Sequence, residues 1–117
     1  MAFTTVNKAS DNFVNKRYSG NASNKTLVTG TFPPDFCWIK KIENSSSSEW
    51  CQFDTVRGAT KIIQSSTNEF EQTMTNTLTA FTSTGFTLGS YGATNGNGDS
   101  FQSINWKAGT TSGIATN

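Results

Sequence analysis

Turn-forming residues interrupt this chain about every ten residues, which limits the length of any helix or strand between them. Two successive prolines cannot donate to a strand ladder, and Gly beside Asn or Asp favours tight reversals. Short segments between regularly spaced turns are typical of an antiparallel sandwich. The strongest signals are Gly20–Asn24, Pro33-Pro34, Arg57–Ala59, Ser83–Gly85 and Asn95–Asp99.

The segments between these turns have the residues of strands rather than helices. Nine Phe, three Trp and two Tyr supply apolar area, and long runs of Leu, Glu and Lys are missing. Aromatic and β-branched side chains suit a pleated surface. We predict residues 67–77 as a loop with one helical turn. The predicted strands are 12–18, 25–29, 36–42, 49–56, 61–66 and 100–107, with 78–88 as a hairpin that turns through three residues, 83–85.

These features predict one all-β domain, a single antiparallel β-sandwich, jelly-roll-like, with short strands and polar terminal arms. A length of 117 residues fits one domain. We expect an N-terminal arm over 1–11, the sandwich domain over 12–109 and a C-terminal extension over 110–117. The predicted core anchors are Trp38, Phe53, Phe81, Phe86 and Trp106.

Charge and hydropathy argue against several partners. Nine Lys and Arg against eight Asp and Glu provide no basic field for a phosphate backbone, so no nucleic acid is expected. No apolar run approaches the 18 or so residues of a membrane span, so no membrane is expected. The first residues, MAFTTVNKASDNF, lack the apolar region of a secretory signal, and we expect synthesis in the cytoplasm.

The residue types also argue against an enzyme, a metal site and a cofactor. The chain has no His, so neither a Ser-His-Asp triad nor a Cys-His pair can form, and two Cys alone make no zinc site. Asn95–Asp99 lacks the Asp spacing and terminal Glu of a calcium loop. A carboxylate pair for glycoside hydrolysis remains conceivable, although exposed, solvating acids are the preferred reading. Its candidate members are Glu49, Asp54, Glu69, Glu71 and Asp99.

The segment CQFDTVRGATK, residues 51–61, is the densest group of charged and reactive side chains. Asp54 and Arg57 are three residues apart around a predicted turn, and Gly58 can supply a positive φ there. Asp side chains bond to turn amides, and the Arg fork matches a carboxylate. We therefore predict a structural ion pair that pins the turn.

The two strongest predicted strands, 36–42 and 49–56, are expected to form a hairpin. If it is centred on Asn44, Cys37 lies opposite Cys51 and Trp38 opposite Trp50, within cross-strand reach. Cys37 and Cys51 could then form a disulfide. Cytoplasmic synthesis favours free, buried thiols instead.

Several blocks together resemble a repeat domain of tailed bacteriophages, found in virion structural and tail-fibre-type proteins of marine and cyanobacterial phages. The resemblance covers roughly residues 12–109 and carries over no catalytic residue. ENSSSSEW replaces a shorter polar loop with His in that domain. The blocks are Tyr18-Ser19-Gly20, PDFCWIKK (34–41), FDTVRGATK (53–61), LTAFTSTGFTLG (78–89) and NWKAG (105–109).

The resemblance implies a non-enzymatic β-rich virion module that assembles in the host cytoplasm. A single unit suits a capsid decoration or cement protein on the outside of the major capsid lattice, with that capsid protein or other virion proteins as partners. A symmetric dimer or trimer is expected. The alternative is a tail-fibre or tail-tip module that binds a host receptor or glycan. Its binding loop would include Tyr91, Asn95, Asn97 and Asp99.

Overall fold

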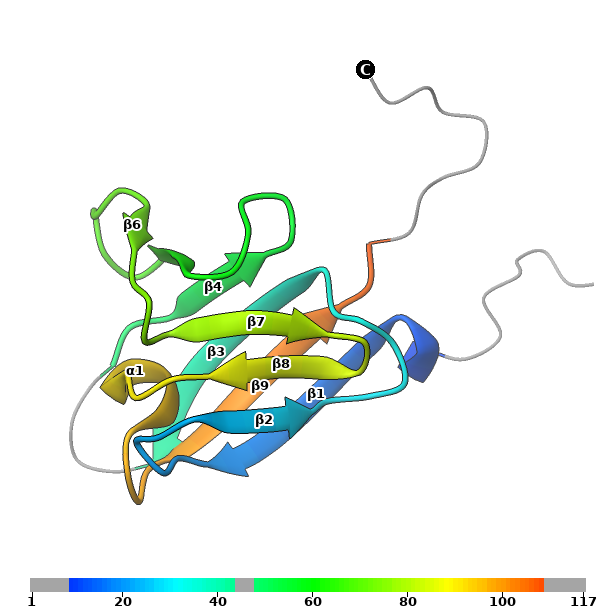
Figure 1. Ribbon diagram of the computed structural model, residues 1–117, viewed down its shortest axis with the longest axis horizontal. Coiled ribbons are helices and arrows are strands. Elements are labelled where there is room, and N and C mark those ends of the chain that lie inside the picture. Colours follow the sequence, from blue (N-terminus) through cyan, green and yellow to red (C-terminus); the bar gives the residue numbers. More distant parts are fainter. Residues whose placement is uncertain (1–8, 44–47, 109–117) are drawn as a thin grey trace, which may run out of the picture.

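The computed structural model describes residues 9–43 and 48–108, and Figure 1 shows the arrangement of their strands. The predicted C-terminal extension and most of the N-terminal arm lie outside these residues. The elements are η1 (Ala9–Asp11), β1 (Phe13–Ser19), β2 (Lys25–Val28), β3 (Phe36–Glu43), β4 (Cys51–Asp54), β5 (Lys61–Gln64), β6 (Gln72–Thr73), β7 (Leu78–Thr82), β8 (Gly85–Leu88), α1 (Gly92–Asn95) and β9 (Ser100–Trp106).

The strands form two antiparallel sheets that pack against each other (Figure 1). The large sheet has six strands in the order β1-β9-β3-β4-β5-β6, and the small sheet has three in the order β2-β8-β7. The predicted all-β sandwich is confirmed. No helix in the described part of the chain is long and apolar enough to span a membrane.

Strand alternation divides the residues of the large sheet between its two faces. In β9, Phe101, Ser103 and Asn105 are fully buried, whereas the residues between them keep some exposure. In β3, Cys37 and Ile39 are likewise fully buried. These residues turn toward the small sheet, and their neighbours face the opposite way.

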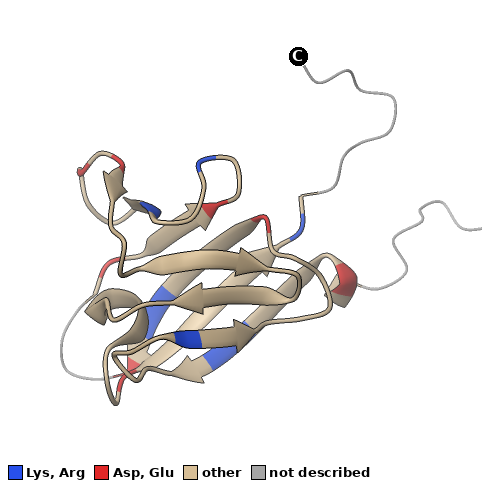
Figure 2. Ribbon diagram, in the orientation of Figure 1, with Lys and Arg blue, Asp and Glu red and all other residues tan. Residues whose placement is uncertain are grey.

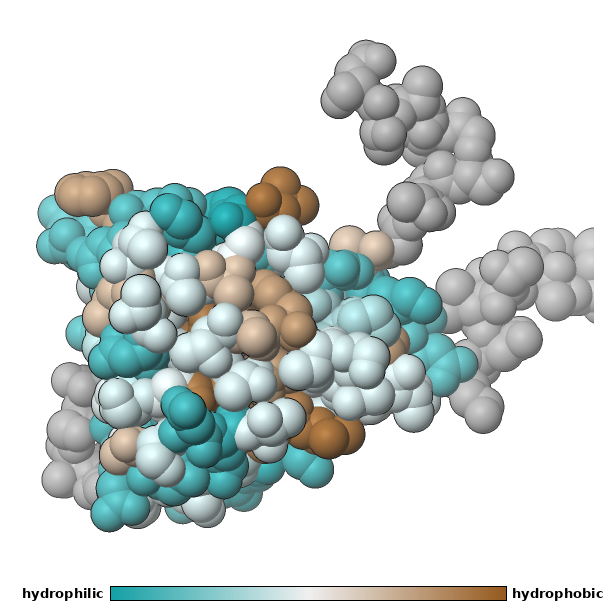
Figure 3. All heavy atoms as spheres, in the orientation of Figure 1, coloured by the Kyte–Doolittle hydropathy of each residue, from teal (hydrophilic) through white to brown (hydrophobic). Residues whose placement is uncertain are grey.

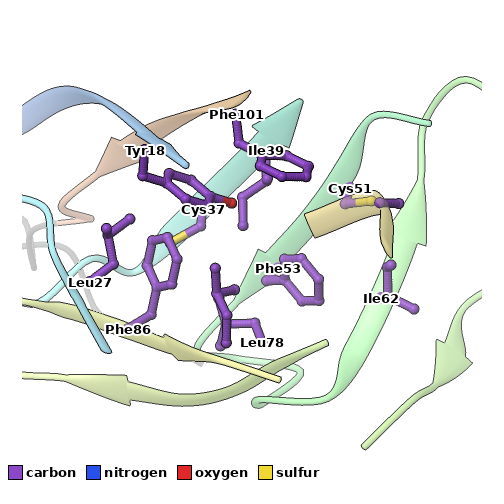
Figure 4. Packing of buried hydrophobic residues seen from close by; sticks show 12 residues of the cluster. Tyr18, Leu27, Cys37, Ile39, Cys51, Phe53, Ile62, Leu78, Phe86 and Phe101 are labelled. Carbon is purple, nitrogen blue, oxygen red and sulfur yellow. The ribbon is translucent and has the colours of Figure 1, made fainter. Parts of the chain in front are cut away.

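The core lies between the two sheets and draws side chains from most strands (Figure 4). Phe53, Phe86 and Phe101 are its largest fully buried side chains. Burying one such ring contributes about 1.5–3 kcal/mol relative to leaving it exposed. The other labelled members are Tyr18, Leu27, Cys37, Ile39, Cys51, Ile62 and Leu78.

The predicted core anchors divide between the two faces of the large sheet. Phe53 and Phe86 are fully buried, and Phe81 is partly buried against the core. Trp38 and Trp106 do not belong to the core, so that prediction is wrong for both. Each follows a buried residue in its strand, Cys37 and Asn105 respectively, and therefore points to the other face.

The register of the β3–β4 hairpin differs from the predicted register by two residues. Cys37 pairs with Phe53, and Ile39 pairs with Cys51, so the hairpin is centred on residue 45 and the predicted Cys37–Cys51 and Trp38–Trp50 pairings are wrong. A shift of two residues leaves every side chain on its expected face. Both cysteines are buried free thiols, not a disulfide.

Two connections also differ from the predicted ones. Residues 67–77 contain the short strand β6 and no helical turn, whereas helix α1 at Gly92–Asn95 was not predicted. The β7–β8 turn occupies only Ser83 and Thr84, because Gly85 already belongs to β8. A Cβ atom on Gly85 would lie 1.9 Å from the carbonyl oxygen of Leu27. Close approach to β2, and not a left-handed φ, therefore requires glycine there.

Gly85→Ala should lower the free energy of unfolding by about 2–3 kcal/mol, since the added methyl must displace the backbone of β2. Chemical unfolding followed by circular dichroism measures the change. Gly92→Ala is the matched control, because its Cβ would have nothing within 4 Å. Equal effects of the two substitutions would contradict the close-approach explanation.

Candidate functional site

The charged cluster that stands out in the sequence forms the turn between β4 and β5. The backbone N–H of Arg57 donates to Asp54 Oδ1 at 2.8 Å, and its side-chain Nε donates to Asp54 Oδ2 at 2.5 Å. Gly58 has φ +96°, and its N–H donates to the Asp54 carbonyl at 3.0 Å. One carboxylate thus fixes both the backbone and the side chain of the turn.

The electrostatics of this turn leave little capacity for chemistry. Partial burial raises the pKa of Asp54, but the hydrogen bonds and charge of Arg57 outweigh it and hold that pKa below its usual value. Arg57 also lies 3.4 Å from Glu71 and donates to the carbonyl of Gln52. The carboxylate is held as an anion by its own turn, which suits a structural ion pair.

The two thiols are unsuited to nucleophilic chemistry. Cys37 and Cys51 have no exposed surface, and burial raises the pKa of Cys51 to about 12. Burial also raises the pKa of Cys37 well above its usual value. The nucleophile is the thiolate, which these environments disfavour. No group of three or more acidic, Cys or His side chains in the described residues could hold a metal ion.

The predicted glycan loop is largely occupied by contacts within the fold. Asn95 is fully buried, accepts from the Asn21 N–H at 3.0 Å, and donates to the carbonyls of Ser23 and Gly89 at 2.7 Å. Its amide therefore holds the β1–β2 connection against the end of α1 and against the β8–α1 connection. It is not available to a ligand.

The other members of that loop differ in their accessibility. Asp99 is buried and lies 2.7 Å from Lys41 in an ion pair whose side chains are only 11–12% exposed. Tyr91 is half-buried, and its hydroxyl accepts from Gln64 at 3.3 Å. Asn97 alone of the four is exposed. The structure does not gather these residues into one open site.

A different surface has the character of a binding site: the face of the large sheet that points away from the small sheet, here called the outer face. All three tryptophans of the chain, Trp38, Trp50 and Trp106, lie on it. The opposite side of the molecule, over β2, β8 and β7, is mostly hydrophilic or neutral, with small separate hydrophobic spots (Figure 3). The tryptophans are therefore concentrated on one side of the sandwich.

One end of the outer face carries a ridge of three aromatic rings. Trp106 of β9 is paired with Phe13 of β1 on one side and with Phe36 of β3 on the other. The ring centroids are 5.4 Å and 5.2 Å from that of Trp106, the spacing of favourable aromatic pairs. Phe13 is 41% exposed, so this ridge is open to a partner.

The other end of the outer face carries a small hollow of about 70 Å³. The ammonium group of Lys40 lies 5.5 Å from the centre of the Trp50 ring, and that ring lies 4.9 Å from Trp38. Apolar side chains with two polar groups at the margin are the usual composition of a recognition pocket. The hollow is lined by Lys40, Ile42, Trp50, Gln102 and Ile104.

A middle row of side chains joins the ridge to the hollow. Ile104 of β9 is paired with Asn15 of β1 and with Trp38 of β3, and Trp38 is paired with Gln52 of β4. The indole N–H of Trp38 is shielded from solvent and has no acceptor among the described residues. Ser48 Oγ and Asn105 Oδ1 are likewise buried without a partner among these residues.

The sequence predictions assign the apolar residues of each strand to a single core, so they do not identify this outer face. In FCWIKKI of β3, apolar residues occupy both parities, so both faces of that strand carry apolar side chains. In β9, Ile104 and Trp106 share the outer parity, whereas the polar Ser103 and Asn105 are buried on the other. An antiparallel strand with one face in solvent usually alternates apolar and polar residues. Adjacent apolar residues in such a strand are therefore the signal that could have identified a second apolar face. The sequence predictions instead assign Trp38 and Trp106 to the core.

Asp54→Asn should lower the free energy of unfolding by about 1 kcal/mol at pH 7, since it removes a charged hydrogen-bond acceptor. Because the folded-state pKa is lowered, this stability is present above the unfolded pKa and is lost as the pH falls through the folded one. The difference from wild type should therefore shrink below about pH 4. Urea unfolding across pH measures it, with the exposed Asp11→Asn as control. A difference that persists at low pH would contradict the ion-pair role.

Comparison with known proteins identifies the family to which the chain belongs. No curated protein and no solved structure matches it. The family model described as "Domain of unknown function (DUF7483)" matches residues 8–117, which include both sheets, the β4–β5 turn and the outer face. The chain belongs to this family.

Proposed function

We propose that the protein is a non-enzymatic structural component of a bacteriophage virion, a capsid decoration or cement protein that binds the outside of the major capsid lattice. The sequence blocks that resemble the phage repeat domain support this proposal, because their residues build the fold. FDTVRGATK forms the end of β4, the Asp54–Arg57 turn and the start of β5. Gly85 in GFTLG permits the close approach of β2 and β8.

The observation that carries the proposal is the contrast between occupied reactive groups and an open aromatic surface. Asp54 is held by Arg57, and both thiols are buried. The outer face instead presents the exposed Phe13 and the hollow around Trp50. Contiguous exposed apolar surface marks an interaction site more often than a chemical one.

Attachment to a lattice suits the other surfaces of the sandwich. Short basic and acidic segments are spread over both sheets and their connections (Figure 2). β1 and β2 end their sheets, and edge strands offer unpaired backbone groups to an added strand. Many weak contacts of this kind, repeated over a capsid, act together through effective concentration.

Quantitative mass spectrometry of purified virions of the encoding phage tests the proposal. A decoration protein should be present in hundreds of copies per particle, in a fixed ratio to the major capsid protein. Its removal should leave assembled but less heat-resistant capsids. A tail protein of known low copy number in the same sample is the internal control. A few copies per particle, or none, would rule out the cement function.

A tail-fibre or tail-tip module that binds a host glycan is the second candidate. The hollow on the outer face favours it, because an aromatic ring beside Lys40 and Gln102 combines a stacking surface with hydrogen-bond donors. A glycan array should then show a ligand that Trp50→Ala loses and that Phe70→Ala, altered at an exposed loop position, retains. Absence of binding to host-surface glycans and host cells would exclude this candidate.

A further inference from the structure

We propose that the outer face is the contact between two copies of this chain, related by a two-fold axis that lies in the interface and runs across the strands along the middle row. This inference names the surface behind the expected homo-oligomer. It does not depend on the virion role, because it concerns the isolated protein.

The two ends of the outer face complement each other. The ridge and the hollow lie on the same central strands, β9 and β3. Phe36 and Lys40 are four residues apart, so the ridge and the hollow are separated by about 13 Å along the strand. Rotation about the middle row reverses the strand direction. It therefore places the ridge of each copy over the hollow of the other.

The alternative two-fold axis, parallel to the strands, does not give this fit. It would place ridge on ridge and hollow on hollow, so that bulky rings meet at one end and a gap remains at the other. The proposed axis fills both hollows with aromatic side chains, and interfaces are packed as densely as protein interiors. The shape of the face therefore favours the two-fold axis that runs across the strands over the axis that runs along them.

The charges near the face are compatible with this contact. Arg17 pairs with Glu43 at 3.0 Å, and Asp54 pairs with Arg57, so neither carboxylate needs a cation from a partner. Lys40 stands at the hollow, where its ammonium donates to the Ser48 carbonyl and lies 5.5 Å from the centre of the Trp50 ring, so it enters the contact already partnered. A lysine ammonium near an indole face is attractive.

The size of the face suits a small dimer contact. At the usual strand spacing, β1, β9, β3 and β4 give about 19 Å of width, and seven residues give about 23 Å of length. This corresponds to about 440 Å² in projection, to which protruding rings add further accessible area. Specific interfaces at the lower end of the range bury about 600 Å² from each partner.

Analytical ultracentrifugation of the full chain over a range of concentrations tests the proposal. The wild type should sediment as a dimer, at twice the chain mass of 12.7 kDa. Ile42→Lys, which places a charge in the hollow, should weaken dimerisation at least ten-fold, and Phe13→Ser at the ridge should also weaken it. Ile42 is 37% exposed, so the variant is expected to fold, as circular dichroism will verify.

Two matched controls separate the outer face from general surface effects. Val56→Lys and Phe70→Ser make the same changes at positions 94% and 81% exposed, outside the four strands of the contact. Both should dimerise like the wild type. A wild type that stays monomeric, or variants of the face that dimerise as well as their controls, would overturn the proposal.

Cross-linking identifies the operator. Asn15→Cys is exposed and lies on the middle row in edge strand β1, so a short bismaleimide should join two such chains only if the axis runs across the strands, whereas Gln102→Cys, two residues from that row on β9, should remain single. The native thiols are buried and should not react in the folded protein. Efficient cross-linking of Gln102→Cys without that of Asn15→Cys would overturn the proposed axis even if a dimer forms.

Discussion

The antiparallel pairing of β3 with β9 is the constraint on which the rest of the structure depends. It runs from Phe36 opposite Trp106 to Glu43 opposite Ser100, with a bulge between Lys41 and Glu43. This pair lies inside the large sheet, with β1 on one side and β4 on the other. One face contributes Cys37, Ile39 and Phe101 to the core, beside the buried polar Ser103 and Asn105, and the other builds the outer face.

A chain so poor in aliphatic residues needs polar groups to complete its interior. Asn95 is fully buried, and its amide ties three segments together. The hydroxyl of Tyr18 donates to the Thr94 carbonyl at 2.6 Å, while its ring lies 5.3 Å from Phe101. Satisfied buried polar groups specify a unique packing, which a loose set of apolar side chains would not do alone.

The sequence was informative where local chemistry decides the structure. The strands and main turns could be predicted, because aromatic and Thr-rich segments alternate with Gly, Pro and Asn. The Asp54–Arg57 contact could be predicted because it spans only three residues. The positive φ of Gly58 follows from the same turn.

What could not be predicted depends on contacts between distant segments. The two faces of β3 cannot be ranked from FCWIKKI alone, since Cys37 and Trp38 are both plausible core residues. The long, polar connection between β3 and β4 gave no turn signal that fixes the register. The burial of Asn95 depends on Asn21 and Ser23, more than seventy residues away along the chain. The same dependence hid the outer face, which exists only once β1, β9, β3 and β4 lie side by side.

The central claim is that the outer face is covered in the functional protein, and intrinsic fluorescence tests it most directly. Because all three tryptophans lie on that face, the emission reports on it alone. On dilution from high concentration, the account predicts a red shift of the emission and stronger quenching by acrylamide, with unchanged circular dichroism. Emission and quenching that do not depend on concentration, at values typical of exposed indoles, would contradict it.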